Sequence, residues 1–154
     1  MKKIILFLGL SMFIWSCEKA AKLENDEYLV FGKFNGFCAS NCTTLFKIEG
    51  GKLYADDMDR YLPGDDLVFE SDPLPTDKYE EALKLYQDIP DKLKETTEMS
   101  FGCPGCVDQD IILLRYFDGA DKKEWQVDSD IESNPEYLQD YAAEVLEVIE
   151  KLNN

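Results

Sequence analysis

The fold of this chain is decided by residues 111–152, which read IILLRYFDGADKKEWQVDSDIESNPEYLQDYAAEVLEVIEKL. The stretch begins with a strongly apolar run at 111–117, which predicts a buried strand. Asp118-Gly119 is a turn signal, and residues 123–128 return with Trp125 and Val127 on one face. The first half of the stretch therefore predicts an antiparallel hairpin.

The second half predicts a long amphipathic helix. Asn134 is a suitable N-cap, and Pro135 fits the first helical position. Apolar residues then recur at helical spacing, at Leu138, Tyr141, Val145, Ile149 and Leu152. The opposite face is acidic and is expected to be solvated surface, with Glu136, Asp140, Glu144, Glu147 and Glu150.

A second hairpin is expected upstream. Residues 28–34 (YLVFGKF) are rich in aromatic and β-branched side chains, and residues 43–49 alternate with Thr44, Phe46 and Ile48 on one face. Gly50-Gly51 is a two-residue turn signal before a return strand at 52–55. Strands and a terminal helix in this order predict an α+β fold.

The centre of the chain is expected to be a loop followed by a middle helix. Residues 56–75 are acidic and hold three prolines, with one short extended piece at 67–69. Asp77 and Glu80 have capping-box spacing at the start of a helix that Pro90 ends. The complete expectation is an antiparallel sheet of about four to five strands packed against the C-terminal helix, with a middle helix.

The N-terminus has the pattern of an export signal. Lys2 and Lys3 give a positive start, residues 4–15 are uncharged and mostly apolar, and Ser16-Cys17 precedes an abrupt change to polar residues. The apolar run is shorter than the ~20 residues that span a bilayer, although an uncleaved anchor helix remains the alternative. The predicted division is a signal peptide at 1–16, a lipidated tether at 17–27 and a single domain at 28–154.

Residues 14–17 (IWSC) resemble a relaxed lipobox of the kind found in Bacteroidetes. The resemblance implies cleavage before Cys17, a diacylglycerol on its sulfur and an acylated amine, and more than one acyl chain anchors a protein stably. Residue 18 is Glu and not Asp, so the retention signal of enteric inner-membrane lipoproteins is not met. The expected location is therefore the cell envelope, lipid-anchored, at the outer membrane.

The composition narrows the possible functions. The formal net charge of −16 repels phosphate backbones, so no nucleic-acid partner is expected. The chain has no histidine, which removes the usual general base near neutral pH and the commonest metal ligand. No G-x-S-x-G motif, phosphate loop or dinucleotide fingerprint is present. We therefore expect no catalytic residue and no cofactor.

The remaining cysteines form two closely spaced pairs, Cys38-x-x-x-Cys42 and Cys103-Pro104-Gly105-Cys106. In an exported chain an even number of cysteines favours structural disulfides, and short loops favour two local bridges over cross-pairing. A site with all four as zinc ligands is the second interpretation. A redox dithiol at Cys103 and Cys106 is the third, but Asp108 and Asp110 would disfavour a thiolate and a strand follows where a helix is needed.

Five aspartates crowd the central loop, at Asp56, Asp57, Asp59, Asp65 and Asp66. They lack the spacing of a calcium-binding EF-hand, and a solvated acidic loop is the favoured interpretation, so no metal site is predicted. Because function concentrates in loops on a rigid scaffold, the region where the two cysteine turns could meet this loop is the expected contact surface.

Four segments together look like a group of small Bacteroidetes lipoproteins for which no activity is established. They are residues 31–48 with Cys42-Thr43-Thr44-Leu45-Phe46-Lys47-Ile48, the Cys103-Pro104-x-Cys106-x-Asp108-Gln109 run, the Trp125 strand and the helix start at Asn134-Pro135-Glu136-Tyr137-Leu138. The resemblance covers most of residues 17–152 and implies the same location and one-domain organisation.

The expected function is that of a non-enzymatic binding or interaction module, held on the membrane by its lipid. Its partner would be an envelope or extracellular protein or ligand. The alternative is a thiol–disulfide redox protein that uses Cys103 and Cys106.

Overall fold

The structure is a computed structural model that describes residues 23, 26–38 and 40–154. The elements in chain order are β1 (Tyr28–Phe34), β2 (Thr43–Glu49), β3 (Lys52–Ala55), α1 (Thr76–Gln87), α2 (Asp91–Glu95), β4 (Ser100–Phe101), β5 (Ile111–Phe117), β6 (Lys122–Asp128), a 3-10 turn (Ile131–Ser133) and α3 (Glu136–Leu152). The predicted signal peptide and Cys17 lie outside the described residues. Of the predicted tether, Leu23, Asp26 and Glu27 are described, and Leu23 is buried. Among the described helices, none is long and apolar enough to cross a membrane.

The predicted α+β architecture is confirmed, with one correction to the strand count. The sheet has six strands in the order β3-β2-β1-β5-β6-β4. All neighbours are antiparallel except β4, which pairs with β6 in parallel. The expectation of four to five strands missed β4, because a two-residue strand is too short to show any alternation in the sequence.

Gly32 allows β1 and β2 to pair closely in the middle of the sheet. Its φ is +152°, and a Cβ on this residue would lie 2.1 Å from the carbonyl oxygen of Thr44. No larger residue fits without moving the β2 backbone, which is why glycine stands inside an otherwise apolar strand.

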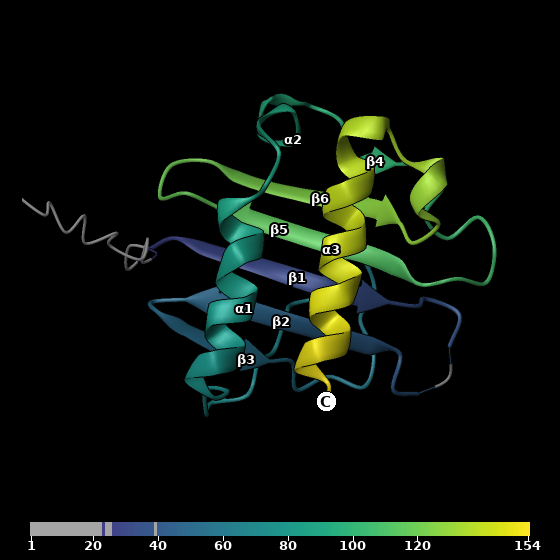
Figure 1. The fold of residues 1–154 in the computed structure, drawn as a ribbon. Helices are drawn as coiled ribbons and strands as arrows, with labels where there is room; N and C mark the ends of the chain where they lie inside the picture. The colour runs from purple at the N-terminus through teal and green to yellow at the C-terminus, as the bar shows by residue number, and fades with distance from the viewer. Residues whose placement is uncertain (1–22, 24–25, 39) are drawn as a thin grey trace, which may run out of the picture.

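Both α1 and α3 lie on one face of the sheet, as Figure 1 shows. The predicted helix stripe from Leu138 to Leu152 is buried there against Phe31, Ile112 and Trp125 of the sheet. The hydroxyl of Tyr141 donates to the carbonyl oxygen of Leu85 at 2.9 Å, which ties α3 to α1. This face therefore forms the main core and is closed to partners.

The other face of the sheet, which we call the open face, is covered only in part. A smaller cluster of Val30, Phe34, Leu45, Ile111 and Leu113 is covered by Tyr61, which is fully buried. Tyr61 belongs to the acidic segment 56–69, which crosses this face between β3 and α1 and whose two ends pair with each other through a β-bridge between Asp56 and Phe69. The predicted loop is thus a partial roof over the open face.

Two predicted helix caps are wrong. Helix α3 begins after Pro135, and the side chain of Asn134 does not cap it but accepts from the backbone N–H of Asp128 and donates to its carbonyl. Helix α1 begins at Thr76 after Pro75, one residue before Asp77, and its N-terminus has no side-chain cap. In both places a proline precedes the first turn, and its fixed φ favours a helix start there.

Candidate functional site

Strand direction brings three segments to the same end of the sheet. Strand β1 ends at Phe34 and β3 at Ala55, whereas β2 begins at Thr43 and β5 at Ile111. The turn 35–42, the start of the acidic segment 56–69 and the turn 102–110 therefore share this end, which we call the loop end (Figure 1). The β2–β3 and β5–β6 hairpin turns lie at the opposite end, where β1 begins.

The first cysteine turn is closed by a disulfide between Cys38 and Cys42, whose Cα atoms are 5.6 Å apart. The backbone N–H of Asn35 donates to the carbonyl of Cys42 at 2.9 Å, and its side-chain oxygen accepts from the N–H of Phe37. Asn41 adopts a left-handed φ of 51°, which asparagine tolerates better than most residues. The result is a fixed turn that leaves the Phe37 ring 78% exposed.

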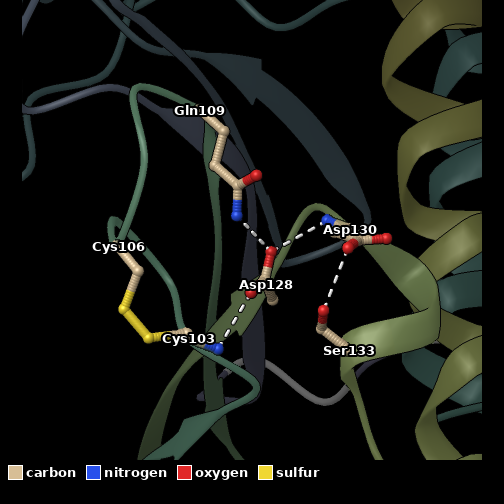
Figure 2. Close-up of a disulfide and its surroundings, with 6 residues drawn as sticks. All are labelled: Cys103, Cys106, Gln109, Asp128, Asp130 and Ser133. Atoms are coloured by element: carbon tan, nitrogen blue, oxygen red, sulfur yellow. Dashed lines mark hydrogen bonds between the residues drawn. A yellow bond between two sulfur atoms is a disulfide. The ribbon is translucent and has the colours of Figure 1, made fainter.

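The second cysteine turn is closed by a disulfide between Cys103 and Cys106, with Cα atoms 5.4 Å apart. Figure 2 shows that this turn is fastened to the end of β6 by the carboxylate of Asp128. That carboxylate accepts from the backbone N–H groups of Cys103 and Asp130, at 2.8 Å each, and from the side-chain amide of Gln109. Asp128 is only 2% exposed, so its charge is balanced by donors and not by water.

Gly102 makes the close contact with Asp128 possible. Its φ is +70°, and a Cβ there would lie 2.6 Å from the Cβ of Asp128. Any other residue would displace the carboxylate from the N–H of Cys103.

The predicted local pairing of the cysteines is confirmed, and it bears on the two alternatives. Both pairs are disulfides, so the four sulfurs are not placed together as ligands. Within the described part of the chain, no group of three or more His, Cys, Asp or Glu residues is arranged to hold a metal ion. Cys103 stands in a turn and does not begin a helix, so the helix-terminus stabilisation of a thiolate is missing.

The three segments of the loop end contact one another, as the sequence predicted they could. The side-chain amide of Asn35 donates to Asp108 at 3.4 Å, which links the two cysteine turns. The backbone N–H of Cys42 donates to the carbonyl of Asp59 at 2.9 Å, which links the first turn to the acidic segment. An ion pair between Lys33 and Asp110, at 2.9 Å, lies beside them.

Each of these segments exposes at least one large apolar side chain, and the acidic segment exposes a second, Val68, at 49%. Phe37 is 78% exposed, Val107 is 61% exposed and Leu62 is 37% exposed. Single exposed apolar residues are ordinary, but these stand on loops that contact one another at the same end of the sheet.

The aspartates of the acidic segment have unequal roles. The carboxylate of Asp56 accepts from the backbone N–H of Leu45 at 2.6 Å, and that of Asp65 accepts from the N–H of Leu62 at 2.9 Å. Burial raises the pKa of Asp56, although the hydrogen bond from Leu45 opposes the shift. Asp57, Asp59 and Asp66 are exposed. Asp56 and Asp65 therefore stabilise the loop, and the exposed carboxylates supply its surface charge.

Asp128 and Asn134 are the two buried polar or charged residues of the described chain; the sequence did not single out Asp128, and it assigned Asn134 the different role of a helix cap. Asp128 accepts from Cys103 and Gln109, which are distant in sequence, so no local pattern marks it, whereas Asn134 bonds locally to the backbone of Asp128 and Asp130. Lys47 and Arg115 were also missed, although a charge inside an apolar strand such as IILLRYF is a visible signal.

Comparison with protein-family models gives no match for this chain, and comparison with curated proteins finds none that is similar to it.

Proposed function

We propose that this chain is an envelope lipoprotein, cut before Cys17 and lipidated there, whose folded domain is a non-enzymatic binding module at the outer membrane. The charge and apolar order of residues 2–17 supports export and lipidation. Two disulfides in a chain of this size are in keeping with an oxidising compartment. The lack of histidine and of any nucleophile motif in the sequence favours binding over catalysis.

The observation that carries the proposal is the direction in which β1 runs, because it separates the tethered end of the domain from the loop end. The chain that leads from Cys17 enters at the start of β1, where Asp26 lies close to Gly119 of the β5–β6 turn. The loop end is at the other end of β1, a distance of about 20 Å for a strand of this length. A domain tethered at one end can therefore present the disulfide-closed turns away from the lipid.

The loop end also has the physical properties of a contact surface. Disulfides fix the two turns that carry Phe37 and Val107, so little conformational entropy is lost when a partner binds them. Asp57, Asp59 and Asp108 add exposed carboxylates to the segments of the loop end. The partner that fits is a protein surface with an apolar recess and a basic rim.

Photocrosslinking on living cells tests this proposal. A photoreactive amino acid is placed at Phe37 or Val107 at the loop end, and at Asp118 in the opposite turn as a matched control. All three positions are exposed or partly exposed, so the fold should tolerate the change. We expect discrete crosslinked products from the loop end that Asp118 does not give. Equal products from all positions, or products from Asp118 alone, would contradict the proposal.

Thiol–disulfide exchange is the second candidate, and one observation favours it. Cys103 and Cys106 are both exposed, so a substrate could reach their disulfide. The reduced protein can be tested for reduction of insulin disulfides beside a Cys103→Ser/Cys106→Ser variant. Turnover that the variant loses would establish redox function, and equal inactivity would leave the binding module as the proposal.

A further inference from the structure

The roof over the open face is incomplete and leaves a hollow of about 350 Å³. Its floor is formed by Val30, Lys47 and Arg115, and its walls by Tyr28, Leu67 and Phe69. Asp66 completes the lining from the acidic segment. The volume is at the lower end of the range of small-molecule sites, roughly 300–1,000 Å³.

The side chains of Lys47 and Arg115 lie on the floor of the hollow at the same level of the sheet. Val30 of β1 is paired with Lys47 of β2 on one side and with Arg115 of β5 on the other. Two strand spacings separate the cationic strands, or about 10 Å, so a small ligand lying over Val30 can reach both side chains. The two side chains are 24% and 17% exposed, so both charges lie partly out of water.

Each cation has one carboxylate partner and retains further capacity to donate. Lys47 donates to Glu49 at 2.8 Å, and Arg115 donates from Nε to Glu124 at 2.6 Å. An ammonium has three N–H groups and a guanidinium has five, so one such bond does not exhaust either. These partners hold the two cations in place, and together with Asp66 they give the five groups a net charge of −1, so binding of an anion here depends on direct hydrogen bonds from Lys47 and Arg115 and not on the net charge of the site.

Tyr61 adds a second polar feature beside Arg115. Its side chain is fully buried and lies outside the residues that line the hollow. Burial and the charge of Glu124 raise the pKa of this hydroxyl, whereas Arg115 and a hydrogen bond to the Gly64 backbone lower it.

The walls of the hollow are flat and apolar. The Lys47 ammonium lies 5.5 Å from the Tyr28 ring centre and 5.9 Å from that of Phe69. Leu67 extends this surface from the acidic segment. A bare inorganic ion would make no contact with these apolar walls, and a polyanion would be repelled by the carboxylates of Asp66, Glu49 and Glu124.

We propose that this hollow binds a small organic monoanion, in which a carboxylate lies between Lys47 and Arg115 and a flat apolar body packs on Tyr28, Leu67 and Phe69. The site lies on the open face of the sheet and uses none of the loop-end residues. It extends the proposed binding function to a second ligand class and can fail independently of the loop-end proposal.

Calorimetric titration of the full chain in detergent micelles tests the site, with empty micelles as the blank. The probe is 2-naphthoate, and its uncharged analogue is 2-naphthalenemethanol. We expect saturable binding of one naphthoate per chain. We expect the alcohol to bind at least about tenfold more weakly, the order expected when a charge-assisted hydrogen bond is lost.

Matched variants locate the binding. Lys47→Gln and Arg115→Gln should each weaken naphthoate binding at least about tenfold. Lys84→Gln removes the same charge and an ion pair of 2.9 Å from the helical side of the protein, and should leave affinity unchanged. If circular dichroism shows that Arg115→Gln does not fold, the Lys47→Gln result decides. The absence of saturable binding, equal binding of the alcohol, or full affinity in a folded floor variant would overturn the proposal.

Discussion

Replacement of Asp128 by alanine should loosen the second cysteine turn and lower the stability of the whole domain. The change removes the acceptor for the N–H groups of Cys103 and Asp130 and for the amide of Gln109. Hydrogen bonds to a charged group contribute roughly 1.5–3 kcal/mol each, and water can replace part of that at the exposed side of the turn. We therefore expect a loss of about 3 kcal/mol in the free energy of unfolding, or about 10 °C in Tm for a domain of this size.

Urea unfolding followed by circular dichroism measures the loss, and Asp130→Ala is the matched control. Asp130 is exposed, and its carboxylate accepts only from the hydroxyl of Ser133, at 3.0 Å, among the hydrogen bonds seen in the described structure. Its backbone N–H, which donates to Asp128, survives the change. The control should cost no more than about 0.5 kcal/mol. If both variants unfold at the same urea concentration as the unchanged protein, Asp128 does not fasten the turn and the reasoning is wrong.

Three further predictions follow from the same contacts. Replacing Cys38 and Cys42, or Cys103 and Cys106, by serine should lower the free energy of unfolding in urea by about 2 kcal/mol per pair. This value is at the low end of disulfide effects because the closed loops are short. An unchanged free energy of unfolding in both variants would show that the bridges are absent or do not stabilise the fold. Because burial raises the pKa of Asp56, the folded state binds that proton more tightly, so the stability contributed by Asp56 is greatest below its ordinary pKa and declines as pH rises. The stability of the protein relative to Asp56→Asn should accordingly fall as the pH rises above the ordinary aspartate pKa of about 4, and a constant difference would refute the shift. Val145→Asp places a charge where α3 meets the sheet, at a side chain with 0% exposure, so far-UV circular dichroism should show an unfolded chain; a folded variant would mean that the packing of α3 is misassigned.

The elements that sequence alone predicted are those with a clear period. The hairpins at 28–55 and 111–128 and the stripe on α3 each repeat an apolar face over several residues, and the structure places them as expected. The local pairing of the cysteines was also predictable, because short loops close easily. The two helix caps were not, because Pro75 and Pro135 fix the helix starts where Asp77 and Asn134 had been expected to act.

The parts of the sites that sequence could not predict depend on the register of the sheet. Lys47 and Arg115 are separated widely in the chain and line the same hollow only because both are paired with Val30, one on each side. Asp128 ends a polar strand, and its burial arises from donors that the second cysteine turn brings to it. Alternation shows which face a side chain occupies but not which side chain lies opposite it.

The central claim is that this is a lipid-anchored protein whose loop end is held by disulfides, and one intact mass tests it most directly. The protein is extracted from cells and alkylated without reductant before mass spectrometry. The account predicts a chain that begins at Cys17, carries a diacylglycerol and a further acyl chain, and has no alkylated cysteine, since the other four are paired. A chain that retains residues 1–16, lacks the lipid mass, or takes up the alkylating agent on its cysteines would contradict it.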